Sequence, residues 1–182
     1  MEESSAFESP RRAPLQLDLS RVLVLSIVST GLYLLFWSYY TWKQLQPETG
    51  ERHYPVWHAL TLFVPIYNLF RLHRHFAVIN DLAAKAGSSS LGPGAGVVLI
   101  LLSNALAYGS IGVTDMAGGL LLLALSTGLV TTALYFAQDG LNDVWRRRDP
   151  YATSKQGVHW TEIALASLGL LGWVAAFFPE SA

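Results

Sequence analysis

Residues 29–40 read STGLYLLFWSYY, a stretch without any charge that ends in a cluster of aromatic side chains. Tryptophan and tyrosine rings favour the membrane–water interface, because one end of each is apolar and the other can be hydrated. The stretch belongs to a longer apolar run, residues 22–42, which is long enough to cross a bilayer as a helix. It therefore predicts a membrane-spanning helix whose outer end carries Trp37, Tyr39, Tyr40 and Trp42.

The composition of the whole chain agrees with a lipid environment. Of 182 residues, 52% are hydrophobic and only 14% are charged, against about 25% charged residues in an ordinary soluble domain. The net charge of -1 shows no basic excess of the kind that binds nucleic acid. Because the chain has no cysteine, disulfides, thiol catalysis and cysteine metal sites are excluded.

Five apolar segments in the chain have the length expected of membrane spans. They lie at residues 22–42, 56–72, 97–113, 119–137 and 160–178. The second is the weakest, because its uncharged run over residues 56–70 is short and contains Pro65, so a re-entrant or interfacial helix is its alternative. The prediction is an all-α polytopic membrane bundle: a disordered tail over residues 1–20, then a single transmembrane domain over residues 21–182.

The positions of the basic residues predict how this bundle is oriented. With five spans, the N-terminal tail and the loops after the second and fourth spans lie on one side. That side carries ten of the twelve Lys and Arg residues: Arg11, Arg12, Arg21, Arg71, Arg74, Lys85, Arg146, Arg147, Arg148 and Lys155. The other side has Lys43 and Arg52. The positive-inside rule therefore predicts a multi-pass protein of the plasma membrane with a cytoplasmic N-terminus.

The second and fourth helices are predicted to extend beyond the membrane on the cytoplasmic side. Their sequences continue as NLFRLHRHFAVINDLAAK and YFAQDGLNDVWRRR. Polar or packing positions on these extensions are Tyr67, Asn68, Arg71, Arg74, Asn80, Gln138, Asp139 and Asn142. Opposed Arg and Asp side chains are expected to pair across the two helices as a collar. The alternative is a polar vestibule or a site for anionic lipid, since Arg and His near the inner leaflet attract phosphates.

Few polar residues lie at depth in the predicted spans. Asn68 and Asn104 are the clearest, and hydrogen bonds between helices are their expected role. No Asp, Glu, Lys or Arg falls near the middle of a span, which disfavours ion-coupled transport. Ala124, Gly128 and Thr132 recur at intervals of four, so this row is expected to pack closely against the third and fifth helices.

The histidines do not suggest a metal site. His73 and His75 are two residues apart, and on a helix such side chains point to nearly opposite sides. The sequence also lacks a phosphate-binding loop, a nucleophile elbow and a zinc-protease motif. It therefore predicts no metal, no cofactor and no catalytic residue.

Three motifs resemble a bacterial membrane family known as domain of unknown function 4234. The first is LSIVSTGLYLLFWSYYTWKQLQ, with Thr30, Gly31, Tyr33, Phe36 and Trp37 in the family's places. The others are VPIYNLFRLHRHFAVIND, with Pro65, Ile66, Tyr67 and Asn68, and AQDGLNDVW, with Gln138, Leu141 and Asn142. Lys43 departs from the family by standing late after the first motif. The resemblance implies a prokaryotic inner membrane and carries no mechanism.

Three functional hypotheses follow. The leading one is a non-enzymatic structural or partner-binding membrane component, either homo-oligomeric or bound to a membrane partner, because no catalytic constellation is visible. The alternative is a small-solute transporter or channel with a polar path through Asn68, Asn104, Thr131 and Asn142. The third is a lipid-modifying enzyme at the cytoplasmic rim, with His73 or Asp139 as the base.

Overall fold

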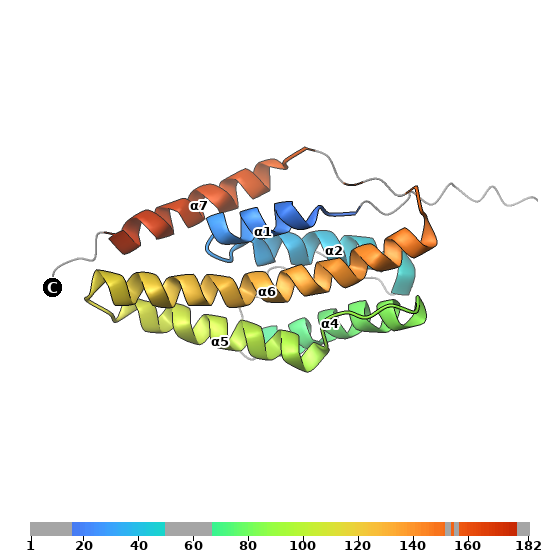
Figure 1. Cartoon of the computed structure of the whole chain (residues 1–182), viewed down its shortest axis with the longest axis horizontal. Coiled ribbons are helices and arrows are strands. Elements are labelled where there is room, and N and C mark those ends of the chain that lie inside the picture. The colour runs from blue at the N-terminus through green and yellow to red at the C-terminus, as the bar shows by residue number, and fades with distance from the viewer. Residues whose placement is uncertain (1–15, 50–66, 152–153, 155–156, 178–182) are drawn as a thin grey trace, which may run out of the picture.

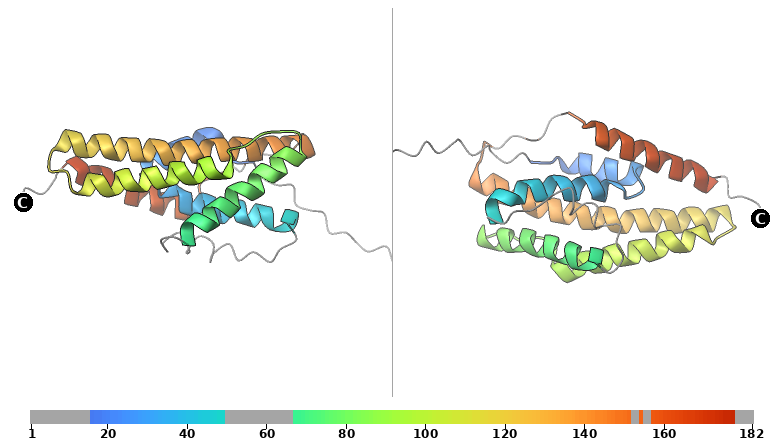
Figure 2. Two further views of the ribbon diagram at one scale, coloured as in Figure 1. Left: turned by 90° about the horizontal axis from the view of Figure 1, so that it is seen from below. Right: turned by 180° about the vertical axis from the view of Figure 1, so that it is seen from behind.

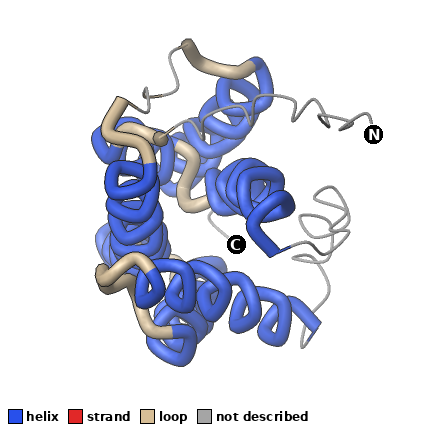
Figure 3. The backbone as a smooth tube through the Cα atoms, turned by 90° about the vertical axis from the view of Figure 1, so that its right-hand side faces the viewer, coloured by secondary structure: helices blue, strands red, loops and turns tan. Residues whose placement is uncertain are grey.

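The computed structural model describes residues 16–49, 67–151, 154 and 157–177. Apart from one isolated bridge between Gln16 and Ser154, all regular structure in these ranges is helical, as Figure 3 shows. The helices are α1 (Leu19–Val28), α2 (Tyr33–Thr49), α4 (Tyr67–Lys85), α5 (Pro93–Ile111), α6 (Met116–Arg148) and α7 (Trp160–Phe177). The predicted all-α class is therefore confirmed.

Helix α6 forms the axis of the bundle. Its 33 residues make a rod of about 50 Å. Helices α1, α2 and α7 lie along one side of it, and α4 and α5 along the other (Figure 1; Figure 2, right). We call the end with Arg146, Arg147 and Arg148 the basic end, and the end with the α5–α6 turn, residues 112–115, the turn end.

Three of the described helices, α5, α6 and α7, are long and apolar enough to cross a membrane. They correspond to the predicted spans 97–113, 119–137 and 160–178, although residue 178 lies outside the described residues. The predicted count of five spans is not confirmed. Residues 56–66 of the second span, including Pro65, also lie outside the described residues. The predicted helical extensions are present, because α4 runs to Lys85 and α6 to Arg148.

The prediction of one continuous helix over residues 22–42 is wrong. Helix α1 has ten residues, about 15 Å, which is half the thickness of a bilayer core. After residues 29–32 the chain reverses, and α2 runs back along α6 (Figure 1). Leu17 before α1 bonds to Asn142, and Glu48 near the end of α2 pairs with Arg148. Both ends of the α1–α2 hairpin therefore lie toward the basic end.

The backbone between α1 and α2 explains the reversal. Thr30 and Gly31 have φ angles of 52° and 87°, in the left-handed region that ends a helix. The Ser29 hydroxyl accepts a hydrogen bond from the Tyr33 amide at 2.8 Å and so caps the next helix. A Cβ on Gly31 would approach Val130 Cγ1 to 2.6 Å, so the turn needs glycine for space as well as for φ.

The prediction that aromatic residues of α2 lie at the membrane–water interface is also wrong for both of its tryptophans. Trp37 and Trp42 are 0% and 2% exposed. Their rings flank His75 of α4, with centroid distances of 4.9 and 4.6 Å. The rings fill the space between α2 and α4, because reversal of the chain turns this face of α2 toward the bundle. Burial in protein therefore replaces the expected contact with lipid headgroups.

The predicted disordered tail ends earlier than residue 20. Residues 1–15 lie outside the described residues, but Leu17 is fully buried. Asp18 accepts a hydrogen bond from the Ser20 amide at 2.8 Å and caps α1. The side-chain and backbone hydrogen bonds from Ser20 hold the pKa of Asp18 below its usual value. The last residues of the predicted tail are therefore part of the fold.

The predicted small-residue row on α6 does not pack against other helices. Ala124, Gly128 and Thr132 are exposed, and a Cβ on Gly128 would meet nothing within 4 Å. The close approach occurs at Gly169 of α7 instead, where a Cβ would overlap the backbone of Ser29. The hairpin turn, rather than α6, is therefore the partner that requires a small residue on α7.

Candidate functional site

A polar pocket lies where the hairpin turn meets α4, α5 and α6, and we call it the central pocket. Its volume is about 290 Å³. It is lined by Thr30, Gly31, Leu32, Leu34, Leu35, Asn68, Ile100, Ser103, Asn104, Ala107, Ser126 and Val130. Four elements far apart in the sequence thus contribute to one cavity.

The central pocket lies at mid-length of the long apolar helices. Gly31 packs on Val130, which lies within the predicted span 119–137 of α6. Ser29, at the start of the same turn, packs on Gly169 near the middle of α7. At this depth in a membrane, irregular backbone is tolerated only where it is buried in protein or lines a cavity. The hairpin turn meets this condition by lining the central pocket.

The polar part of the pocket wall comes mostly from α4, α5 and α6, and the Thr30 hydroxyl of the turn, which also lines the pocket, donates to the Ser29 carbonyl. Ser126 donates a hydrogen bond to the Ser103 carbonyl at 2.9 Å, and the two hydroxyl oxygens are 3.1 Å apart. Asn104, one residue further on α5, is exposed and lines the pocket. Asn68 of α4 lines it as well. Hydrogen bonds between helices were expected for both asparagines, and the structure brings both to the central pocket.

Gln138 and Asn142 belong to a different, fully buried network. The Trp37 indole donates to Gln138 Oε1 at 2.8 Å, and the Gln138 amide donates to Asn142 Oδ1 at 2.8 Å. The Asn142 amide in turn donates to the Leu17 carbonyl at 2.6 Å. The network connects α2 and Leu17, which precedes α1, to α6. Neither Asn142 nor Thr131, which is buried, lines the central pocket, so the predicted four-residue path does not form one site.

The remaining predicted positions lie apart from both groups. The guanidinium of Arg71 stacks over the Tyr67 ring, 5.2 Å from its centroid. Arg74 is exposed, and Asn80 and Asp139 are half-buried. These residues form no shared cavity with Asn68 and Asn104.

A collar of Arg and Asp pairs between the second and fourth predicted helices was expected at the basic end. The ion pairs that the described residues form there are different. Arg147 Nε lies 2.9 Å from Asp143 Oδ2 within α6, and Arg146 pairs with the same carboxylate. Arg148 pairs with Glu48 of α2. The ion pair between helices thus joins α6 to α2, because the hairpin brings the end of α2 beside the end of α6.

A buried ion pair that the sequence did not predict lies between α1 and α7. The Glu162 side chain is 0% exposed and the Arg21 side chain 12%. Glu162 accepts hydrogen bonds from Arg21 Nε at 3.0 Å, from the His159 amide at 2.7 Å and from the Tyr33 hydroxyl at 3.4 Å. In the sequence, the pair is marked only by the position of Arg21 and Glu162 at the start of two apolar runs. Because neither residue lies in the middle of a predicted span, where charged residues were sought, the pair was missed.

The histidines of α4 bear out the expected geometry. His75 is buried, with Nε2 2.8 Å from the Thr41 hydroxyl, whereas His73 is exposed. The described ranges contain no group of three or more His, Cys, Asp or Glu residues that could hold a metal ion. The two rings therefore cannot chelate one ion together.

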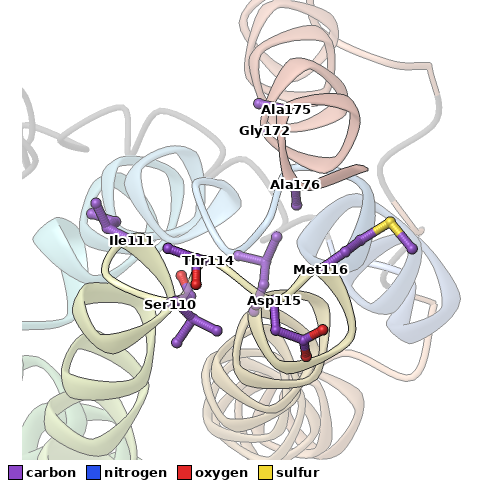
Figure 4. Close-up of a pocket in the computed structure, with 11 residues that line it drawn as sticks. Ser110, Ile111, Thr114, Asp115, Met116, Gly172, Ala175 and Ala176 are labelled. Carbon is purple, nitrogen blue, oxygen red and sulfur yellow. The ribbon is translucent and has the colours of Figure 1, made fainter. Parts of the chain in front are cut away.

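A second cavity, of about 490 Å³, opens at the turn end. Figure 4 shows Gly172, Ala175 and Ala176 of α7 beside the turn that carries Thr114. Its polar groups mostly serve the local backbone: Asp115 accepts from the Gly118 amide at 2.7 Å, and Ser110 donates to the Ala107 carbonyl at 2.7 Å. This cavity has one charged residue in its described lining, Asp115, whereas the described lining of the central pocket is uncharged.

No protein-family model, no curated protein and no solved structure matches this chain. The resemblance of its three motifs to domain of unknown function 4234 therefore stays a prediction.

Proposed function

We propose that the chain is a multi-pass protein of the bacterial plasma membrane that binds a small solute in the central pocket and moves it across the bilayer. The observation that carries the proposal is the reversal of the chain at mid-depth, beside the amides of Asn68 and Asn104. Transporters commonly place their substrate sites near the bilayer midplane, at interrupted helices.

The buried ion pair adds support to a transport role. The sequence disfavoured ion-coupled transport because no ionisable residue fell near mid-span. Arg21 and Glu162 are nevertheless both held inside the bundle, at the junction of the hairpin with α7. Ionisable residues buried within membrane proteins are rare and commonly mark functional elements. The pair attaches to α7 the same hairpin that lines the central pocket.

We propose three crossings, by α5, α6 and α7, with the basic end in the cytoplasm. Lys43 of α2 lies between Trp37, which bonds to Gln138, and Glu48, which pairs with Arg148, so it also belongs near the basic end. The positive-inside rule then favours a cytoplasmic basic end and N-terminus. This arrangement keeps the predicted orientation but moves Thr49 from the outer to the inner side.

Single-cysteine labelling in intact cells tests the topology, and the absence of native cysteine makes the signal specific. We expect Thr49→Cys and Ser89→Cys to be protected from an impermeant thiol reagent added outside, and Thr114→Cys to be labelled. Labelling of Thr49→Cys from outside would restore the five-span topology and contradict a hairpin that returns to the basic end.

Labelling with a small, uncharged and water-soluble thiol reagent tests the pocket. We expect Asn104→Cys to react, because a polar cavity at this depth admits water. Leu102→Cys is the matched control: it lies on the same helix at similar depth, is 51% exposed, and does not line the pocket. If both cysteines are equally unreactive, the pocket is dry, and a non-enzymatic structural role becomes the better proposal.

A further inference from the structure

Among the described residues, no charged side chain lines the central pocket. The twelve described lining residues are all uncharged, and the polar ones carry hydroxyl or amide groups. An ion moved from water into such a site would lose its hydration without meeting a counter-charge, which costs far more free energy than burial of a hydrogen-bonded neutral group. The chemistry of the lining thus favours a neutral ligand.

Charged groups near the pocket are engaged with other partners. Arg21 and Glu162 pair with each other on the α7 side of the hairpin. Arg71, three residues after Asn68, stacks on Tyr67 and does not line the pocket. An ionic ligand would therefore have to break the Arg21–Glu162 pair before it gained either of these two groups as a counter-ion.

The pocket lining combines two chemical characters. The helices α4, α5 and α6 contribute amides and hydroxyls, which supply both donors and acceptors of hydrogen bonds. The hairpin contributes Leu32, Leu34 and Leu35, whose side chains offer only apolar contact. A ligand that matches both the polar and the apolar part of the lining must have one hydrogen-bonding head and an apolar body.

The volume limits the size of that ligand. At about 290 Å³, the central pocket lies at the lower end of ligand sites, which span about 300–1,000 Å³. The fit is to a compact molecule rather than to a lipid or a peptide.

We infer that the central pocket takes a small uncharged molecule with one amide or hydroxyl head and a short branched or linear apolar body. This inference rests on the proposed function, since it names the class of solute that would occupy the same site. It predicts discrimination between a neutral molecule and ions of the same shape.

The test uses the purified full chain in lipid nanodiscs with Ala107→Cys as the reporter, because Ala107 lines the pocket and its replacement leaves both asparagines in place. The rate of labelling by the uncharged thiol reagent is measured with isobutyramide, with isobutyrate and with isobutylammonium. At ten times its dissociation constant, the amide is expected to slow labelling about tenfold, since only the unliganded fraction reacts. The two ions are expected to leave the rate unchanged.

A pocket variant and a control variant separate binding from effects on the fold. Asn104→Leu in the reporter background should raise the dissociation constant of isobutyramide about tenfold, as expected for one lost hydrogen bond. Thr132→Val is the control: it replaces an exposed hydroxyl of α6 that bonds to the Gly128 carbonyl and lies outside the pocket. Protection should be unchanged in the control.

The remaining outcomes assign any failure to one proposal or the other. Equal or stronger protection by either ion would overturn the neutral-ligand inference while leaving a solute-binding pocket in place. Labelling that none of the three compounds slows would also overturn it, because the pocket would then hold water alone. No labelling of Ala107→Cys in any condition would overturn the proposed function itself, because the reagent could not enter.

Discussion

Removal of one partner from the Arg21–Glu162 pair should destabilise the protein strongly. Arg21→Met leaves the Glu162 carboxylate, which is 0% exposed, without its counter-ion, although the His159 amide and the Tyr33 hydroxyl still donate to it. Leaving a buried charge without its counter-ion costs about 3–5 kcal/mol. Glu162→Leu should cost less, because the Arg21 side chain is 12% exposed and can move toward water.

The double variant Arg21→Met/Glu162→Leu distinguishes a buried ion pair from simple packing. Because it removes both charges and keeps apolar volume, its free energy of unfolding should return to within about 2 kcal/mol of the native value. The double-mutant cycle should therefore give a coupling energy above about 1 kcal/mol. The measurement is equilibrium unfolding in mixed detergent micelles, followed by circular dichroism.

Arg147→Met is the matched control. Arg147 pairs with Asp143 one helical turn away, and both side chains are partly exposed. Surface pairs at this spacing contribute about 0.3–0.5 kcal/mol, so the control should unfold almost like the native chain. If Arg21→Met loses no more stability than Arg147→Met, or if the double variant loses the sum of both single changes, the argument from burial is refuted.

Three further perturbations test the hairpin and its anchors by the same unfolding assay. Gly169→Ala should lower the free energy of unfolding by about 1–3 kcal/mol, because the added methyl group overlaps the hairpin turn. Gly128→Ala is the control: its methyl group enters open space, so it should be neutral or stabilising by up to about 1 kcal/mol. Equal effects of the two changes would contradict the close approach of α7 to the turn. Trp37→Phe should cost about 1–3 kcal/mol by leaving Gln138 Oε1 buried without its donor, and an unchanged stability would show that the network is dispensable. Asp18→Ala should cost about 0.5–2 kcal/mol by removing the cap of α1, a loss that Asp18→Asn should largely avoid.

The helical class and the long apolar helices were predictable because each depends on local sequence. Runs of apolar residues at the length of a bilayer identify α5, α6 and α7 without reference to the rest of the chain. Pro93 after Gly92 and Asp115 before α6 are ordinary helix-start residues, and the structure begins helices there. The predicted extension of α6 to Arg148 follows from the same local reasoning.

Two residues of the candidate site were predictable from residue type alone. Asn68 and Asn104 stood out because polar side chains are rare in apolar spans, and both line the central pocket. Gln138 and Asn142 stood out as polar positions on the extension of the fourth predicted helix, but they bond within the network of Trp37. Residue type identifies a polar group that needs a partner, whereas the partner depends on which helices become neighbours.

By itself, the sequence determined that this chain forms apolar helices with basic residues gathered between the apolar runs. Only the tertiary structure decided that residues 22–42 reverse at Thr30 and Gly31 rather than continue. The reason is that lipid and a protein interior are both apolar, so a ring such as that of Trp37 suits either one. A left-handed turn is permitted by glycine but is selected only by contacts such as those with Val130 and Gly169, which lie about a hundred residues or more away in the chain.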